Sequence, residues 1–280
     1  KTLQLPDQWI LSCYHECAQE VTAHFDECEF GLAAQKIYDF AWSEFCDWYI
    51  ELAKGGLLGE DAQRKATVRA VLSYVLSGLL RMLHPFMPFL TETVYAFLPG
   101  CEEASCMLSD WPRAEEIPFF PAQEAQMEGI MEIIRAVRNL RAEMNVQAGH
   151  KARLMIRPAD GWQDAVAGAE VFFQRLASAS ELDVLSSDQA VIEKTVGAVV
   201  TAGEILIPLG ELVDIEKEIA RLNKERDNLL KEIARAEGKL NNEGFLRKAP
   251  ETLVQAERDK LVANQTKLTA LDARIADLKQ

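Results

Sequence analysis

The sequence predicts a mainly α-helical chain with an antiparallel helix bundle, a small α/β domain and a long antiparallel coiled-coil hairpin. Three observations predict this fold class. Apolar residues recur at helical spacing in four segments before residue 98, they alternate with other residues after residue 151, and they form two heptad runs on either side of a turn near residue 241. We therefore expect three domains, at residues 1–121, 122–210 and 211–280.

The first domain is expected to be a four-helix bundle. Apolar stripes at helical spacing cover residues 6–27, 30–54 and 61–83. Gly55-Gly56 is expected to end the second helix, and His84-Pro85 the third, because proline cannot continue the hydrogen-bond ladder. The fourth helix, which ends near residue 98, is expected to carry Leu90, Val94 and Phe97 on its inner face.

The second domain is expected to combine helices with strands. Residues 99–121 are rich in proline and predict an irregular linker, which helix 122–145 follows. Apolar residues at every second position from 152 to 157 predict a half-buried strand. The remaining expected elements are a helix at 162–179, a short strand at 183–185 and a hairpin of strands at 196–200 and 204–207.

The third domain is predicted from apolar residues that repeat every 3.5 positions over residues 212–240 and 254–278. Two such seams bury each other, so these runs predict antiparallel arms of roughly 45 Å each at 1.5 Å per residue. So narrow a hairpin has little core of its own and is expected to contact a partner. Asn264 in the seam is expected to set the register. Arg226 has two open interpretations, a side chain that reaches out along the seam or a bend.

Charge is distributed unevenly along the chain. The net charge is −14, yet residues 211–280 contain equal numbers of acidic and basic residues, so the whole excess lies in residues 1–210. Within that part, residues 130–160 are basic, and the acid is concentrated in residues 1–60 and 92–128. A polyanion is therefore expected to meet the later half of the chain and to be repelled by the first.

Several classes of protein are not supported by the sequence. No apolar run approaches the roughly 20 residues of a membrane span, and a start without methionine suggests a piece of a longer protein. The six cysteines form no C-x-x-C pair, so we expect reduced cytosolic thiols and no metal site. Phosphate-loop, G-x-S-x-G and H-E-x-x-H motifs are absent, and His84 is expected to interact with a helix end. The chain by itself is therefore not expected to be an enzyme.

Contact with RNA is the function that the basic residues favour. They lie on helix 122–145, on the strand after it and on both arms, where they would form charge-assisted hydrogen bonds with phosphates. The alternative is that alternating Glu and Lys only keep a coiled coil soluble. The candidate RNA-binding residues are Arg135, Arg138, Arg141, Lys151, Arg153, Arg221, Lys224, Lys231, Arg235, Lys239, Arg247 and Lys248.

Tyr38, Trp42 and Tyr49 form an aromatic stripe beside the apolar stripe of the second helix. Such rings can stack on the bases of a single-stranded loop. They can equally pack helices together in a bundle, which is the favoured interpretation. A function from another class, a protein-interaction module whose hairpin docks a partner, also stays open.

Several segments resemble the valyl-tRNA synthetases. Residues 42–54 (WSEFCDWYIELAK), residues 83–92 (LHPFMPFLTE) and Trp111-Pro112 are similar to the anticodon-binding bundle of that family. The His-Pro-Phe-Met-Pro-Phe run is shared with isoleucyl and leucyl enzymes. Residues 245–250 (FLRKAP) and 257–261 (ERDKL) resemble the C-terminal coiled coil of bacterial-type valyl enzymes.

The resemblance implies that the chain is the C-terminal tRNA-binding part of a class I synthetase, which joins valine to its tRNA using ATP and magnesium. The bundle would hold the anticodon stem-loop, and the hairpin the outer corner where the D and T loops meet. Both ATP-binding signatures are absent from this sequence, so no cofactor is expected in the chain itself. The implied partners are valine tRNA and the catalytic and editing domains of the same protein, in a cytoplasmic monomer with no membrane contact. An isoleucyl- or leucyl-type enzyme is the alternative within the resemblance.

Overall fold

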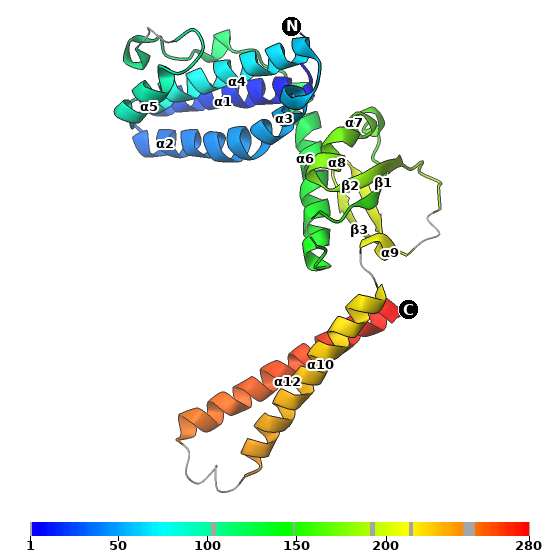
Figure 1. The fold of residues 1–280 in the computed structure, drawn as a ribbon. Helices are drawn as coiled ribbons and strands as arrows, with labels where there is room; N and C mark the ends of the chain where they lie inside the picture. The colour runs from blue at the N-terminus through cyan, green and yellow to red at the C-terminus, as the bar shows by residue number, and fades with distance from the viewer. Residues whose placement is uncertain are drawn as a thin grey trace. The chain divides into compact units, whose positions relative to one another are not determined.

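The computed structural model describes residues 2–279 except 102–104, 148, 191–193, 213–214 and 243–249, and the side chains of 215–221, 274 and 277–279 are also outside the description. The chain is 68% helical with a small, mixed, four-stranded sheet, which confirms the mainly α-helical prediction (Figure 1). It forms two compact units. The first contains Lys1–Ala136, Pro158–Ala177 and Val199–Glu204, and the second contains Val137–Arg157, Ser178–Ala198 and Ile205–Gln280. The division into three domains stays a prediction.

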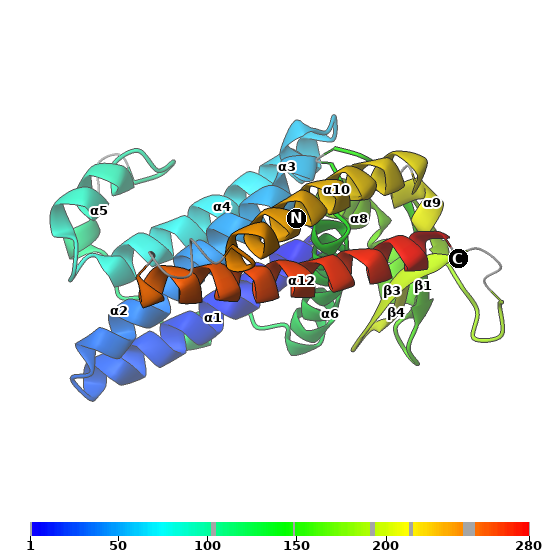
Figure 2. The same ribbon diagram turned by 90° about the horizontal axis from the view of Figure 1, so that it is seen from below.

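Long helices at the start of the chain form the bundle of the first unit. Helix α1 packs against α2 and α4, and both views show these helices side by side (Figures 1 and 2). The core contains large side chains such as Trp9, Tyr14 and Phe40, all almost fully buried. The helices are α1 (Leu5–Asp26), α2 (Phe30–Asp39), α3 (Ile50–Leu58), α4 (Ala62–Leu83) and α5 (Pro88–Tyr95).

The second predicted helix differs from the expectation in its middle and at its end. Between α2 and α3 the chain forms a π-helix, Phe40–Tyr49, and the helical run continues through Gly55 and Gly56 to Leu58. A π-helical turn contains more residues than an α-helical turn, so it shifts which side chains face the core. The glycines do not end the helix because α3 packs along α4, where tertiary contacts outweigh a weak helix propensity.

The inner face of α5 was predicted correctly only at Val94, which is partly buried and packs against an apolar cluster. Leu90 and Phe97 are 52% and 83% exposed, whereas Thr91, Tyr95 and Leu98 are buried. Tyr95 and Leu98 belong to an apolar cluster with Leu80 and Cys106. Contacts with this cluster set the orientation of the helix.

The segment after α5 is irregular, as predicted, with two short 3-10 turns at Cys106–Leu108 and Ala114–Glu116. It is fixed to α1 by hydrogen bonds. The Trp111 indole donates to the Thr22 hydroxyl at 2.8 Å, and the Phe120 backbone N–H donates to the Ser12 hydroxyl at 2.8 Å. Helix α6 (Pro121–Glu143) follows, with the expected side chains buried.

Four short strands form the sheet in the order β2-β1-β4-β3, and β1 pairs with β2 in parallel. Leu154 lies opposite Leu182 and Ile156 opposite Val184. The predicted helix at 162–179 is instead two helices, α7 (Gln163–Gly168) and α8 (Glu170–Leu176), and the chain is already a strand from Ala179. The strands are β1 (Ala152–Pro158), β2 (Ala179–Val184), β3 (Thr195–Val200) and β4 (Gly203–Pro208).

The last part of the second unit contains the short helix α9 (Leu209–Leu212) and the long helices α10 (Ile215–Leu240) and α12 (Glu251–Lys279). α10 and α12 pack along each other in opposite directions (Figure 1). Their buried side chains come from the predicted seams, namely Leu222, Ile233, Ala236, Asn264 and Ile275.

The two polar seam residues have distinct environments. Asn264 is only 6% exposed, and its amide donates to the Glu232 carboxylate at 3.3 Å. Arg226 keeps 38% of its side chain exposed and reaches toward the Asp227 carboxylate at 3.9 Å. Its position agrees with a side chain that extends out along the seam.

Helix α4 is long and apolar enough to cross a membrane, by length and composition alone. The expectation that no run approaches a span therefore does not hold for this helix. Core helices pass the same test, so it is weak evidence for a span. In the structure α4 packs against α1, α3 and α5, and 44% of the apolar window is buried.

A buried carboxylate joins three segments of the bundle. Asp7 at the start of α1 is fully buried and accepts hydrogen bonds from the Tyr49 hydroxyl at 2.9 Å and from both Nη atoms of Arg64, one of them at 3.1 Å. It also accepts from the backbone N–H of Gln4 at 2.9 Å. A buried charge is tolerated only when it is paired and hydrogen-bonded in this way.

Replacing Asp7 should therefore strongly destabilise the bundle. We expect Asp7→Ala to lower the free energy of unfolding by about 3–5 kcal/mol, because Arg64 and Tyr49 lose their buried partner. The control is Asp61→Ala, which removes an exposed N-cap of α4 that accepts from Gln63 and Arg64 and should cost about 1 kcal/mol. Urea unfolding followed by circular dichroism measures both. Equal losses would contradict this role of Asp7.

Candidate nucleic-acid interface

A basic stripe runs along α10. Lys224, Lys231 and Arg235 are exposed, and at about 100° per residue they fall within roughly 40° of one another around the helix. The buried residues Leu222, Ile233 and Ala236 lie on the far side, roughly 100° or more from the stripe. The stripe therefore faces away from the buried seam, and at Arg235 it borders a groove that α12 also lines.

The other basic residues predicted for the arms have different environments. Lys239 is exposed but forms an ion pair with Glu257 at 2.6 Å, so its charge is partly compensated. The backbone of Arg221 continues the stripe, but its side chain lies outside the description. Arg247 and Lys248 fall outside the described residues.

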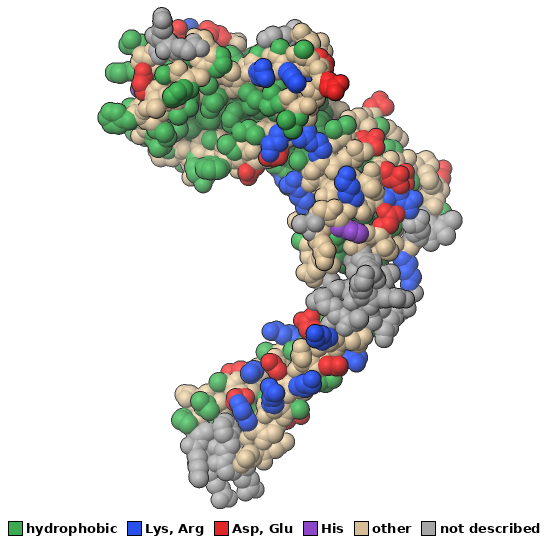
Figure 3. Space-filling model, in the orientation of Figure 1, with side chains coloured by type: hydrophobic (Ala, Val, Ile, Leu, Met, Phe, Trp, Pro, Cys, Tyr) green, Lys and Arg blue, Asp and Glu red, His purple; other side chains and the backbone are tan. Residues whose placement is uncertain are grey.

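The structure adds one basic residue that the sequence prediction missed. Lys260 of α12 lines the same groove as Arg235 and Lys239, together with Glu232 and Glu257. The sequence could have indicated Lys260, because it lies next to the predicted seam of α12. Residues that flank the seam of one helix come close to those that flank the seam of its partner. Figure 3 shows Lys and Arg side chains interspersed with acidic ones along this helix pair.

The predicted basic residues between α6 and β1 are mostly engaged within the protein. Arg153 lies between two carboxylates, at 3.7 Å from Asp183 and 3.4 Å from Glu211. Arg141 donates to the backbone carbonyl of His150, and burial lowers the pKa of its guanidinium. Arg138 and Lys151 are exposed.

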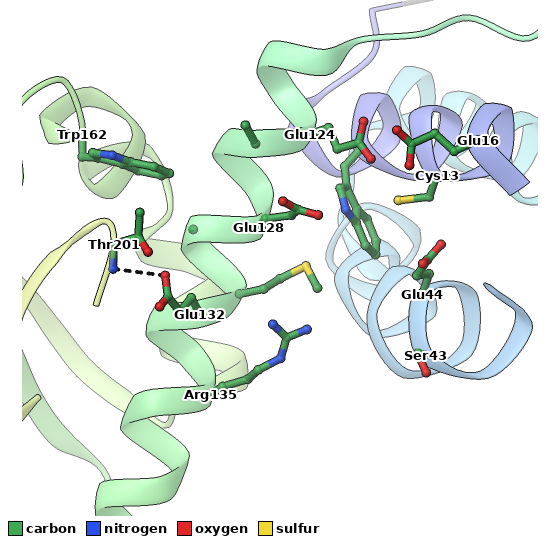
Figure 4. Close-up of a pocket in the computed structure, with 14 residues that line it drawn as sticks. Cys13, Glu16, Ser43, Glu44, Glu124, Glu128, Glu132, Arg135, Trp162 and Thr201 are labelled. Atoms are coloured by element: carbon green, nitrogen blue, oxygen red, sulfur yellow. Dashed lines mark hydrogen bonds between the residues drawn. The ribbon is translucent and has the colours of Figure 1, made fainter. Parts of the chain in front are cut away.

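Arg135 lies at an acidic pocket of the first unit (Figure 4). Its guanidinium carbon is 5.0 Å from the centroid of the Trp48 ring, a cation–π contact. The pocket has a volume of about 600 Å³, and a phosphate entering it would meet far more negative than positive charge. The carboxylates that line it are those of Glu16, Glu44, Glu124, Glu128 and Glu132.

Crowding of these carboxylates changes their proton affinity. Burial, and then the charges of Glu16 and Glu128, raise the pKa of Glu124 to about 7. Burial also raises the pKa of Glu44 above its usual value. Glu132 accepts a hydrogen bond from the backbone N–H of Thr201 at 3.2 Å. An acidic pocket of this kind is unsuitable for a polyanion.

The aromatic stripe of the second predicted helix separates into two environments. Tyr49 is fully buried and bonded to Asp7, so its ring is not accessible to a base. Tyr38 and Trp42 are 58% and 56% exposed, with ring centroids 6.2 Å apart. Packing was therefore the right interpretation for Tyr49, whereas base stacking stays a prediction for the exposed Tyr38 and Trp42. The π-helix Phe40–Tyr49 has more residues per turn than an α-helix, so Tyr49 lies on a different face of the helix from Tyr38 and Trp42.

Further exposed apolar side chains lie around α5. Phe89 is 88% exposed and Phe97 83%, and hydrophobic side chains cover much of the visible face of the bundle (Figure 3). Met107 and Leu108 in the following turn are also exposed. Sequence periodicity missed Phe97 because it placed this residue in the core.

The pKa of Glu124 predicts a pH dependence of stability. The pKa of Glu124 is higher in the folded state than in the unfolded state. The contribution of this carboxyl to the free energy of unfolding is therefore fully present below about pH 4.5 and is lost as the pH rises through about 7. Glu124→Gln should remove this loss, so the variant gains stability relative to the parent between pH 5 and pH 8. Urea midpoints at several pH values measure it. The exposed Glu60→Gln is the control, and parallel pH curves for Glu124→Gln and the parent would contradict the prediction.

Two models of known protein families together match most of the chain. A model described as the anticodon-binding domain of tRNA ligase matches residues 7–156. A second model, described as the valyl tRNA synthetase tRNA binding arm, matches residues 214–279 and so covers α10 and α12.

Individual relatives agree with these matches. The chain is 44% identical to the valine–tRNA ligase of Clostridium acetobutylicum over 275 residues, and 45% identical to that of Clostridium tetani over 279. It is 40% identical to that of Bacillus subtilis over 274 residues. The alignments cover 98–100% of this chain but only 31–32% of each relative, so the chain spans about a third of their length.

Proposed function

The chain belongs to the valyl-tRNA synthetase family through its anticodon-binding domain and its tRNA-binding arm, and from this premise we propose that it holds valine tRNA for a valine–tRNA ligase. The bundle takes the anticodon stem-loop, and the α10–α12 pair, which we propose is a coiled coil, takes the elbow where the D and T loops meet. The observation that carries this proposal is the coincidence of the arm match with a basic stripe that faces away from the seam.

The proposal assigns different chemistry to the two contacts. Lys224, Lys231 and Arg235 would neutralise phosphates, a contact that positions RNA without reading its sequence. Tyr38 and Trp42 offer flat, exposed rings to unstacked bases of a loop. Arg138, Lys151 and the other basic residues predicted from the sequence stay candidates for phosphate contacts.

The attachment of valine to tRNA is proposed for the longer protein of which this chain would be a part. ATP and magnesium would then bind in its catalytic part, and the described residues here would contribute only to the position of the tRNA. A cytoplasmic location follows from the same proposal, because charged tRNA is used where translation takes place, and we propose that the protein is a monomer.

A protein dock on the arm is less well supported. The exposed large apolar residues described on α10 and α12 are Leu230, Leu253 and Val262, which are scattered rather than contiguous in sequence. Scattered exposed apolar residues are ordinary on protein surfaces. Recovery of a stoichiometric protein partner without tRNA would favour this alternative.

Footprinting of valine tRNA with the 280-residue chain distinguishes the two contacts. The proposal expects protection at both the anticodon loop and the elbow. If neither the anticodon loop nor the elbow is protected, the proposal is overturned. If only one of them is protected, the contact at the other is excluded.

Reversing the stripe should weaken binding. We expect Lys224→Glu, Lys231→Glu and Arg235→Glu together to reduce affinity for valine tRNA on the order of tenfold or more at low salt, and to lower the slope of log affinity against log salt by about 2–3. Fluorescence anisotropy over a salt series measures both.

The matched control keeps the charge and changes the side chains. Lys224→Arg, Lys231→Arg and Arg235→Lys together should leave affinity and salt slope close to those of the parent, and circular dichroism should show the same helicity for all three proteins. Unchanged binding by the reversed variant would remove α10 from the RNA interface.

The aromatic pair should contribute through stacking. We expect Trp42→Ala to weaken binding of valine tRNA by about 1–3 kcal/mol, the usual loss for one stacked base, with a smaller loss for Trp42→Phe, which keeps a ring. Leu58→Ala, which removes an aliphatic side chain that is 79% exposed, is the control. A Trp42→Ala variant that binds as Leu58→Ala does would exclude Trp42 from base stacking.

A further inference from the structure

Three side chains with metal-binding chemistry meet beside the end of α4. His84 is the C-cap of α4, Glu92 lies in α5, and Cys106 opens the 3-10 turn that follows. One ligand atom from each lies within 4.8 Å of the other two. The three residues belong to the first unit, and none of them is used in the proposed contacts with tRNA.

The histidine is held in a form suited to a metal. Its Nδ1 lies 2.7 Å from the Thr91 hydroxyl. That hydroxyl donates to the backbone carbonyls of Met87 at 2.9 Å and Pro88 at 3.1 Å, so toward His84 it acts as the acceptor. In the tautomer in which the Thr91 hydroxyl accepts, Nδ1 of His84 carries the proton and Nε2 keeps the lone pair that a metal would take. Metal-binding histidines are commonly oriented by such a hydrogen bond on the other ring nitrogen.

The cysteine and the glutamate complete a mixed set of donors. Cys106 is 3% exposed and belongs to the apolar cluster with Leu80, Tyr95 and Leu98. Burial, and then the charge of Glu92, raise the pKa of its thiol. The Met107 backbone N–H donates to Oε2 of Glu92 at 3.3 Å, which holds that carboxylate beside the turn that contains Cys106. A divalent cation would favour the charged forms of both groups.

We infer that His84, Glu92 and Cys106 form a zinc site with one solvent ligand. Sulfur, imidazole and carboxylate together suit Zn²⁺, which prefers tetrahedral coordination by such donors. With bonds of about 2.3 Å to sulfur and 2.1 Å to nitrogen, the two atoms would lie about 3.6 Å apart. The observed separations of up to 4.8 Å require the three side chains to close by roughly an ångström. This inference does not depend on the proposed contact with tRNA.

A bound ion would join α4, α5 and the segment that follows. That segment is irregular. Hydrogen bonds from Trp111 and Phe120 fix its later part to α1, and hydrogen bonds from Arg81 to Asp110 and from Ser109 to Tyr95 hold its earlier part to α4 and α5. Zinc would add a further link near Cys106. Because metal binding requires the folded arrangement, it adds to the stability of the unit.

Metal binding to the whole reduced 280-residue chain tests the inference. Zinc alone, added under a thiol-free reductant, should bind with one equivalent per chain and raise the melting temperature. Cobalt as a probe should give the intense visible bands of tetrahedral Co²⁺ and a near-ultraviolet band from a single thiolate. X-ray absorption of the zinc form should show one sulfur and three nitrogen or oxygen neighbours.

Variants establish which residues hold the ion. Cys106→Ser, which is nearly isosteric, should abolish the thiolate band and weaken zinc binding at least 100-fold, and Glu92→Gln should weaken it without loss of helicity. Cys28→Ser removes an exposed thiol elsewhere on the bundle and should change nothing. Failure of the parent chain to bind zinc, or equal affinity in the parent and Cys106→Ser, would overturn the inference.

Discussion

The buried carboxylate of Asp7 is the constraint on which the architecture of the bundle depends. A charge without access to water must find partners, and here they come from α4 through Arg64 and from the π-helix through Tyr49. The burial of Tyr49 has a consequence for the side chains about two and three helical turns earlier. The π-helical segment changes the face of the helix, and Tyr38 and Trp42 remain exposed. The interaction that stabilises the core thus removes Tyr49 from the surface, and the two other rings stay exposed.

Charge is organised differently in the two units. In the first, carboxylates crowd a pocket closely enough that burial and mutual repulsion raise the pKa of Glu124 to about 7. In the second, basic side chains on α10 share one face that points away from the packed seam. A polyanion would therefore be repelled at the pocket and attracted to the stripe, which agrees with a partner that is held at defined places rather than over the whole surface.

The pairing of α10 with α12 also explains the behaviour of polar seam residues. Asn264 is buried beside Glu232, where its amide has a hydrogen-bond partner, and a shift in register would separate them. Arg226 extends its guanidinium toward Asp227 with 38% of its side chain exposed, while its Nε is buried without a hydrogen-bond partner among the described residues. Both residues interrupt the apolar repeat of the helix pair.

The sequence by itself determined the elements whose signals are local and periodic. Helical apolar stripes located α1, α4 and α6, alternation located β1, and heptads located α10 and α12, because each pattern repeats over many residues and averages out exceptions. Tertiary structure alone decided the face of α5, the π-helix between α2 and α3, and the compensation of Arg153 by Asp183 and Glu211. It also brought His84, Glu92 and Cys106 together from separate segments. These features depend on contacts between residues distant in sequence, which no local period records.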